Sequence, residues 1–469
     1  MKKILVYRLL LIVIHVCFAI HAYAGAPTSI EVGTARIDIS PQTPIRLAGF
    51  GVRVKAEATN ILQRLNAKAV AIGSDKEGPA IIITVDLIGI PWSITNEVAI
   101  RLKKVGIAPE QLAICASHTH SGPEIGTLIN ILQYRTNEIF SDSLLPVEQL
   151  EHISRYIRQL PDQLEQVALA ALKNRKPSVL SWGIGKVDFA HNRRAVGGPV
   201  DHDMPLMKIT DLKGKLKAVF LNYACHAVAM GGATNEVHGD WVGEAQQQIE
   251  REHPGVTALI AVGCGADANP YREPKSKTLS ALDFTISCGQ KIAAETNRLL
   301  STSLRPISSV PSCRMKKIEL PYSTIPDTKI LIQQTKEGTV KAYYSRLALE
   351  QIARGNPIPS ALKDFPIQSW TFGKDLVMIF YGGETLSAYS LRLKKELAND
   401  KLWVNGYSND VSCYIASEDA LRDPRFIYET THSMYYYDKP APFASGVEDK
   451  IISTVYELLP PFLKDHTNR

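Results

Sequence analysis

The sequence lacks a strong excess of either charge, a long apolar stretch beyond its first residues, and any internal repeat or low-complexity linker. Its 53 lysines and arginines and 47 acidic residues give a formal net charge of +6 over 469 residues. So small an imbalance argues against a nucleic-acid partner. No later stretch reaches the roughly 20 apolar residues that a membrane helix needs. What remains is a chain long enough for one large domain or two ordinary ones.

Cysteine is also sparse, with seven residues in the whole chain. Cys17 lies in the N-terminal apolar run, and the other six show no spacing typical of a disulfide framework. Four of the six lie on or beside apolar strands. We interpret these four first as small buried residues, with disulfides or metal ligation as the alternative; they are Cys115, Cys225, Cys264 and Cys413.

The first 24 residues have the features of an export signal. Three basic residues (Lys2, Lys3 and Arg8) are followed by a mostly apolar run over 9–20. Ala22-Tyr23-Ala24 then fits a small-x-small cleavage site. We therefore expect cleavage after Ala24, and a single mature domain over residues 25–469 that resides in the periplasm or outside the cell.

Apolar strands alternate with amphipathic helices along the rest of the chain, which predicts an α/β fold with mixed sheets flanked by helices. We expect strands at 30–39, 67–72, 80–90, 112–115, 179–187, 206–209, 217–225, 257–262, 314–320, 376–381 and 402–407. We expect helices at 94–105, 147–174 with a break at Pro161, 241–252 capped by Asp240, 279–300, 340–354, 385–397 and 447–458. The aromatic segment 428–445 is expected to be a loop.

Two histidines follow the strand expected at 112–115, within the segment Ser-His-Thr-His-Ser-Gly-Pro. Side chains alternate in extended backbone, so His118 and His120 would point to the same side. They could share a metal, or one could bind it while the other supports a reacting group. A pattern this short also occurs as two exposed histidines at a strand end.

Chemically capable residues follow other apolar strands in the same way: His226, Asp267, Glu384 and Tyr414. Each alone could be a solvated loop residue. Ligands of open α/β sheets bind at the carboxyl ends of the strands, where such residues come together. Two histidines and a carboxylate suit zinc, which keeps a further position for water. The pattern therefore indicates a metal site at the carboxyl ends of the strands.

The chain also resembles the neutral/alkaline non-lysosomal ceramidase family. Residues 117–123 are similar to that family's Thr-His-Thr-His-Ser-Gly-Pro motif. Weaker matches follow the family's order over about residues 30–430. They are Gly49-Phe50-Gly51, Asn192-Arg193, Cys225-His226, Gly239-Asp240, Gly383-Glu384-Thr385, 409–415 and Tyr428-Glu429.

The resemblance implies an exported zinc amidase that cleaves an N-acyl amide, such as a ceramide-like lipid, by metal-activated water. It implies four zinc ligands: His118, His226, Glu384 and Tyr414. It also implies catalytic roles for residues around the metal. His120 would aid proton transfer or hold the scissile carbonyl, Arg193 would contact the oxyanion or the product carboxylate, and Tyr428 would donate a hydrogen bond. We count Asp267 with this catalytic group.

The sequence departs from the family pattern at several positions. Asn269 stands where the family has a serine sometimes proposed as nucleophile, and an amide cannot serve in that role. Arg194 replaces the serine of Asn-Arg-Ser-Pro, and Ala227-Val228 follow His226 in place of Pro-Thr. The chain also stops soon after Tyr428-Glu429, so we expect no C-terminal β-sandwich domain.

Three functions stay open on this pattern. The first is the zinc amidase with a lipid substrate and possible peripheral membrane contact. The second is a metal hydrolase of the same fold that acts on a non-lipid amide, a sugar or an ester, and the third is a non-catalytic exported binding protein. None of the three implies a protein partner. A lipid substrate predicts an apolar groove beside the metal, which the aromatic segment could line, unless its side chains are ordinary loop packing: Met434, Tyr435, Tyr436, Tyr437 and Phe443.

Overall fold

The computed structural model describes residues 28–53, 56–125, 135–136, 139–140, 145–273, 278–337, 339–397 and 400–464. The predicted export signal lies outside these residues. Within the described part of the chain, no helix combines the length and the apolar character needed to cross a membrane.

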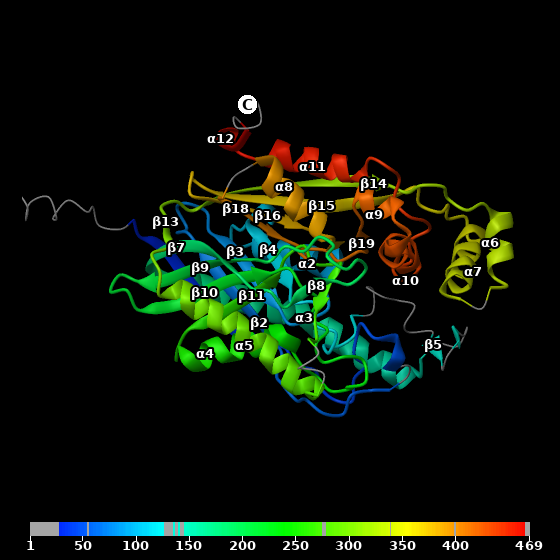
Figure 1. Ribbon diagram of the computed structural model, residues 1–469, viewed down its shortest axis with the longest axis horizontal. Coiled ribbons are helices and arrows are strands. Elements are labelled where there is room, and N and C mark those ends of the chain that lie inside the picture. The colour runs from blue at the N-terminus through cyan, green and yellow to red at the C-terminus, as the bar shows by residue number, and fades with distance from the viewer. Residues whose placement is uncertain are drawn as a thin grey trace, which may run out of the picture.

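Two β-sheets pack face to face, and helices cover the outer face of each sheet (Figure 1). The larger sheet has the order β11 (Thr257–Val262), β10 (Leu216–Tyr223), β9 (Asp203–Asp211), β7 (Lys176–Lys186), β1 (Ile30–Asp38), β2 (Asn66–Ile72), β3 (Ala80–Val85) and β4 (Leu112–Ala116), with β13 (Arg305–Ile307) beside β7. The smaller sheet has the order β14 (Pro311–Pro321), β15 (Ala361–Phe372), β16 (Leu376–Tyr381) and β18 (Leu402–Asn405). Two-stranded pairs complete the described strands: β5 (Arg135–Thr136) with β6 (Ile139–Phe140), β8 (Ala190–Asn192) with β12 (Ala268–Pro270), and β17 (Glu384–Thr385) with β19 (Tyr414–Ile415).

The central strands are apolar on both faces because both faces are covered. All six residues of β3 are buried, for example. One face of the larger sheet meets the smaller sheet in a shared core, where the rings of Phe220 and Trp403 stack with centroids 4.9 Å apart. The opposite face meets helices. This arrangement accounts for the unbroken apolar runs in the sequence.

Helices α3 (Val147–Lys173), α4 (Asp240–Glu252) and α5 (Ala281–Leu300) cover the larger sheet, while α8 (Ser387–Leu397) and α11 (Val447–Leu458) cover the smaller one (Figure 1). α6 (Thr328–Gln334) and α7 (Val340–Ala353) lie beside α10 (Ser433–Tyr436), away from the sheets. The other α-helices of the described residues are α2 (Trp92–Lys103), α9 (Glu418–Arg422) and α12 (Pro461–Lys464).

The mixed α/β architecture predicted from the sequence is confirmed, but several local expectations were wrong. α3 runs through Pro161 without a break, because its buried apolar stripe holds both halves on the sheet and outweighs one lost hydrogen bond. The segment expected as a loop begins with a π-helical turn, η6 (Tyr428–His432), that continues into α10. Asp240 does not act as a simple cap: its φ is 55°, and its carboxylate also accepts from the backbone of Ala229 and Met230.

All six cysteines of the predicted mature chain are free thiols, and five of them are buried. The four cysteines beside the polar strand ends belong to the buried group. Their interpretation as small core residues is confirmed.

Strand ends from both sheets meet at one place. β4 and β10 lie far apart in the strand order, yet the backbone N–H of His120, just after β4, donates to the carbonyl of Ala227, just after β10 (3.2 Å). The smaller sheet joins them, since the N–H of Asn409 donates to the carbonyl of Ile114 (2.7 Å). The larger sheet is therefore curved, and the loops after β4, β10 and β18 form one connected region.

Candidate metal centre

Two histidines and a carboxylate converge in this region. Glu384 Oε2 lies 3.2 Å from His118 Nε2 and 3.2 Å from His226 Nε2. His120 Nε2 lies 3.2 Å from His118 Nε2. The side chains of His118, His226 and Glu384 are buried. The three histidines form a group whose ligand atoms lie within 4.8 Å of one another. The residues predicted from separate strand ends are thus brought together.

Backbone carbonyls fix the tautomers of the two buried histidines. His118 Nδ1 lies 2.6 Å from the carbonyl oxygen of Ile88, and His226 Nδ1 lies 3.0 Å from that of Gly265. A carbonyl only accepts, so each Nδ1 carries the proton and each Nε2 presents a lone pair. Burial, followed by the charge of Arg193, lowers the pKa of His226 to about 4, so this imidazole is neutral at pH 7.

The lone pairs of both Nε2 atoms therefore face Glu384 Oε2, a buried oxygen that makes no hydrogen bond. Three acceptors around one point repel one another unless a cation lies between them. Ligands about 2.0–2.1 Å from a tetrahedral zinc are separated by about 3.3 Å, close to the separations found here. The donor set and its spacing fit a metal ion of the zinc type.

Tyr414, the fourth predicted ligand, lies at the same place. Its hydroxyl is 3.3 Å from His226 Nε2 and accepts a hydrogen bond from Arg193 Nη2 (2.9 Å). The guanidinium also donates to Glu429 Oε1 (2.8 Å). Burial opposes the charge of Arg193, but Tyr414 and Glu429 outweigh it and raise the pKa of the guanidinium. Burial raises the pKa of the Tyr414 phenol well above its usual value, and the positive charge of Arg193 beside the oxygen opposes this shift.

Tyr428 and Arg194 extend the site outward from Tyr414. The ring centroids of Tyr414 and Tyr428 are 5.7 Å apart, and the guanidinium of Arg194 lies 5.0 Å from the Tyr428 centroid. Arg194 Nε donates to both oxygens of Glu429 at 2.7 and 2.9 Å. Glu429, which the sequence motif contained without a role, thus links the two arginines.

Asp267 lies behind the centre. One of its oxygens accepts from the backbone and hydroxyl of Ser387 (2.8 and 2.7 Å), and the other accepts from Asn192 Nδ2 (3.0 Å). Its carbonyl accepts from the N–H of Arg193 (2.8 Å). Asp267 therefore holds the loop that carries Asn192 and Arg193, and the start of α8, in position.

Arg53 was not selected from the sequence, although it lies two residues after the glycine-rich loop 49–51. Its Nη1 donates to the carbonyls of His120 (2.5 Å) and Ala48 (3.1 Å), and its Nη2 donates to Ser121 Oγ (3.2 Å). Burial lowers the pKa of Arg53 to about 10, so it stays charged at neutral pH. The available signal was an arginine that follows the two glycines of this loop closely in sequence. Arg53 ties this loop to the histidine motif.

Gly49 allows that loop to approach His120. Its φ is +86°, and a Cβ at this position would lie 2.2 Å from His120 Nδ1. We expect Gly49→Ala to displace the imidazole and to lower hydrolytic activity by about 10- to 100-fold, since small misplacements of catalytic groups have effects of that size. Steady-state kinetics measures this effect. Gly106→Ala, at another positive φ with open space around it, is the matched control and should keep full activity.

Tyr407 was not predicted as a site residue, and Tyr437 was predicted only as a possible groove residue, not as a partner of Glu384. The Tyr407 ring packs on His118 with centroids 4.3 Å apart. The Tyr437 hydroxyl donates to Glu384 Oε1 and leaves Oε2 to face the histidines. No local sequence pattern predicts either contact, because the tertiary structure, and not a strand end, brings the two tyrosines to the site.

We expect Tyr437→Phe to weaken metal binding by about 10- to 100-fold, because residues that orient a metal ligand typically contribute that much. Competition with a chromophoric chelator measures the affinity. Tyr389→Phe is the control: its buried hydroxyl donates to Ala416 instead (3.0 Å). Equal metal affinity in both variants would contradict the orienting role of Tyr437.

A groove of about 630 Å³ lies next to Tyr428. Its lining includes Ile427, Tyr435, Tyr436 and Lys341. Of the aromatic segment, Tyr435 and Tyr436 therefore line a groove, as one of the two interpretations expected. The remaining members are buried and follow the packing interpretation: Met434, Tyr437 and Phe443.

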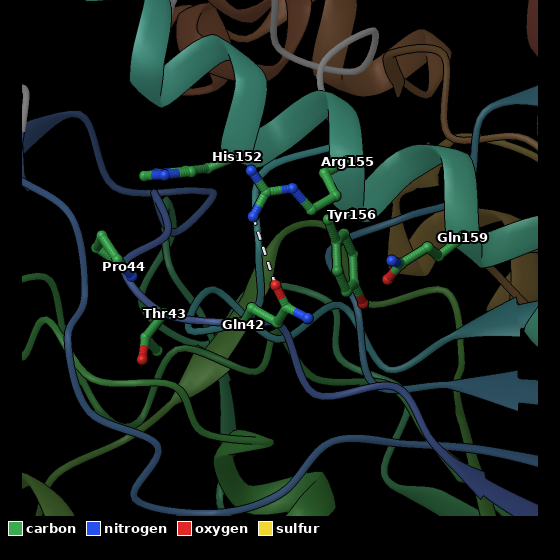
Figure 2. A pocket seen from close by; sticks show the side chains of 7 residues that line it. All are labelled: Gln42, Thr43, Pro44, His152, Arg155, Tyr156 and Gln159. Atoms are coloured by element: carbon green, nitrogen blue, oxygen red, sulfur yellow. Dashed lines mark hydrogen bonds between the residues drawn. The ribbon is translucent and has the colours of Figure 1, made fainter.

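A much smaller cavity of about 30 Å³ lies between the loop 42–44 and α3 (Figure 2). Arg155 reaches Gln42 across it, with Nη1 3.4 Å from Oε1. It shares no lining residue with the histidine cluster. Its volume suits a single water molecule, so we assign it no functional role.

Comparison with known proteins agrees with this fold. The family model for the N-terminal domain of neutral/alkaline non-lysosomal ceramidase matches residues 30–269. The crystal structure of neutral ceramidase from Pseudomonas aeruginosa superimposes with a TM-score of 0.70, at 17% identity, over 92% of this chain and 75% of that chain. A ceramidase complexed with C2 gives a TM-score of 0.69, at 16% identity, over 92% of this chain and 76% of that chain. At these identities the structural likeness establishes the fold.

Proposed function

Because the chain belongs to the neutral/alkaline non-lysosomal ceramidase family, we propose that it hydrolyses the amide bond of a ceramide-like N-acyl lipid, with zinc at the candidate metal centre. One observation carries this proposal. Two imidazole lone pairs and a carboxylate oxygen without a hydrogen bond face one another in a buried site, at 3.2 Å separations.

Each residue of the centre has a role in this proposal. His118, His226, Glu384 and Tyr414 hold the ion, which supplies the Lewis acidity that activates water and polarises a carbonyl. Arg193 holds a positive charge beside Tyr414, where negative charge develops on the substrate oxygen. His120 presents Nε2 to the centre and can carry a proton between water and the leaving amine.

The groove beside Tyr428 supports a lipid substrate. A closed polar pocket would have favoured a small polar amide. This open groove is lined by three tyrosines, by Val340 and by Ile427, which is 48% exposed, together with polar residues that include Glu337 and Lys341. Tyr428 connects it with the centre, because its ring also contacts Tyr414. We assign the groove to the apolar chain of the substrate.

The test uses the purified protein without its first 24 residues. We expect elemental analysis to find about one zinc per chain, and N-lauroylsphingosine to be converted to laurate and sphingosine. Zinc-loaded protein that leaves every N-acyl lipid intact would overturn the amidase function. The absence of zinc after reconstitution would overturn the metal assignment.

We also propose that the protein is exported and that the mature chain begins at Gly25. The basic start, apolar run and small-x-small site in the first 24 residues support this. Cell fractionation with N-terminal sequencing tests it, and an intact N-terminus on the cytoplasmic protein would contradict it.

Asn269→Ala separates metal-activated water from covalent catalysis. Asn269 pairs with His191 between β12 and β8, and its side-chain oxygen is buried without a hydrogen bond. We expect kcat/KM to stay within about threefold of the wild-type value, since removing a group that takes no part in the transition state has little effect. A loss of about a hundredfold with unchanged thermal stability would assign Asn269 a direct role.

A further inference from the structure

Two arginines share one carboxylate at the outer side of the centre. Arg193 Nε and Arg194 Nε both donate to Glu429 Oε1, at 2.8 and 2.7 Å. Glu429 is completely buried. Arg193 also lies beside Tyr414 and Glu384, whereas Glu429 is the ion-pair partner of Arg194.

The terminal amino groups of Arg193 point toward the metal centre, whereas no such contact with the residues that the structure describes is made by those of Arg194. Arg193 Nη2 donates to Tyr414, and its Nη1 lies 3.3 Å from His226 Nε2. Within the described residues, the two terminal amino groups of Arg194 have no partner, and the side chain is 28% exposed. Arg194 therefore offers several N–H donors in the planar arrangement that matches a carboxylate or similar anion.

Tyr428 connects the donors of Arg194 with the groove that we assign to the apolar chain of the substrate. Its ring lies against the Arg194 guanidinium and the ring of Tyr414, and it also lines the groove. Lys341 and Glu337 both line the same groove and offset one another in charge. Arg194 thus combines an ion pair to Glu429 with terminal N–H donors that are still available beside Tyr428.

We propose that Arg194 makes this enzyme selective for N-acyl amides that carry an anionic group, with N-acyl amino acids as the substrate class. The inference rests on the amidase function proposed above and changes its preferred substrate from a neutral ceramide-like lipid to an N-acyl amide with a carboxylate. The N-acyl chain occupies the groove, the amide reaches the centre, and the carboxylate pairs with Arg194.

The test compares two substrates that differ only in charge, N-lauroylglycine and N-lauroylglycinamide. We expect the wild type to prefer the glycine conjugate in kcat/KM by about 10- to 100-fold, mainly through KM, as one charge-assisted pair allows. Arg194→Ser should abolish the preference, because it should lower kcat/KM for N-lauroylglycine far more than kcat/KM for N-lauroylglycinamide. Arg194→Lys should keep part of the preference. Arg101→Ser removes a similarly exposed arginine on α2 (26%) and should change neither rate.

Several outcomes would overturn the inference. If Arg194→Ser lowers hydrolysis of both substrates equally, Arg194 only supports Glu429. If it weakens inhibition by laurate but keeps the substrate preference, the anion that Arg194 binds is the fatty-acid product. If the wild type hydrolyses N-lauroylsphingosine and shows no preference for the glycine conjugate, the inference fails while the amidase function stands.

Isothermal titration calorimetry can compare the binding of N-lauroylglycine and N-lauroylglycinamide without relying on their hydrolysis. If N-lauroylglycine binds more tightly than N-lauroylglycinamide and the difference disappears in Arg194→Ser, Arg194 recognises the carboxylate. If no amide is hydrolysed in the same experiments, the amidase function fails while this recognition stands. Equal binding of the two conjugates contradicts the role of Arg194.

Discussion

Glu384→Gln is expected to abolish metal binding and to reduce amidase activity by about a thousandfold or more, since the metal supplies several kcal/mol of transition-state stabilisation. The substitution removes the negative charge that faces His118 and His226 at 3.2 Å. The new amide can also donate N–H groups to the two imidazole lone pairs. It would satisfy them in place of a cation, so the variant should stay folded while its site is closed to metal.

Elemental analysis and steady-state kinetics on the same preparation measure both effects. Glu244→Gln is the matched control, because Glu244 is another buried carboxylate 3.2 Å from a histidine nitrogen, that of His238, outside the centre. The control should keep its metal and its activity. A Glu384→Gln protein that retained one zinc and normal kcat would show that the ion lies elsewhere.

Trp403→Ala is expected to lower the free energy of unfolding by about 3–5 kcal/mol, the range for large aromatic residues removed from a core. Trp403 is fully buried between the sheets and stacks on Phe220 at 4.9 Å. Its indole N–H also donates to Asn405 Oδ1 (3.0 Å), a buried amide that the truncation leaves short of a partner. The variant therefore loses apolar contact from both sheets and one buried hydrogen bond.

Urea unfolding at fixed zinc concentration measures this loss, because bound metal itself stabilises the folded state. Tyr271→Ala truncates an aromatic ring that is 46% exposed and should cost much less. Trp403→Ala with a loss below about 1 kcal/mol would mean that the two sheets do not depend on this contact.

The sequence was most informative where strands are unbroken apolar runs. β11 and β16 were expected at the bounds they have, because burial on both faces removes polar residues from them. β15 was missed, since Lys363, Asp364 and Pro366 interrupt its pattern near one end. The strand forms nonetheless, because β14 and β16 flank it on both sides.

The residues of the site also fall into those that the sequence pattern indicates and those that it does not. The strand pattern pointed to His118, His226, Glu384 and Tyr414 because each follows an apolar strand, and the resemblance to the ceramidase family then implied that these four are zinc ligands. Arg53, Tyr407 and the contact of Tyr437 with Glu384 were missed because tertiary structure, not local pattern, brings these side chains to the histidines and Glu384. Sequence patterns identify residues at the ends of strands that meet at one edge of the sheets. They do not identify side chains that reach the same edge only through the tertiary structure.

The meeting of strand ends from both sheets has a consequence for how the protein matures. His118 and His226 follow strands of the larger sheet, whereas Glu384 follows β16 of the smaller sheet, which is synthesised later. A partly synthesised chain would have the imidazoles without the carboxylate and would hold the ion weakly. We therefore expect tight metal uptake to mark completed docking of the two sheets, so that the enzyme cannot become active before its own assembly is finished.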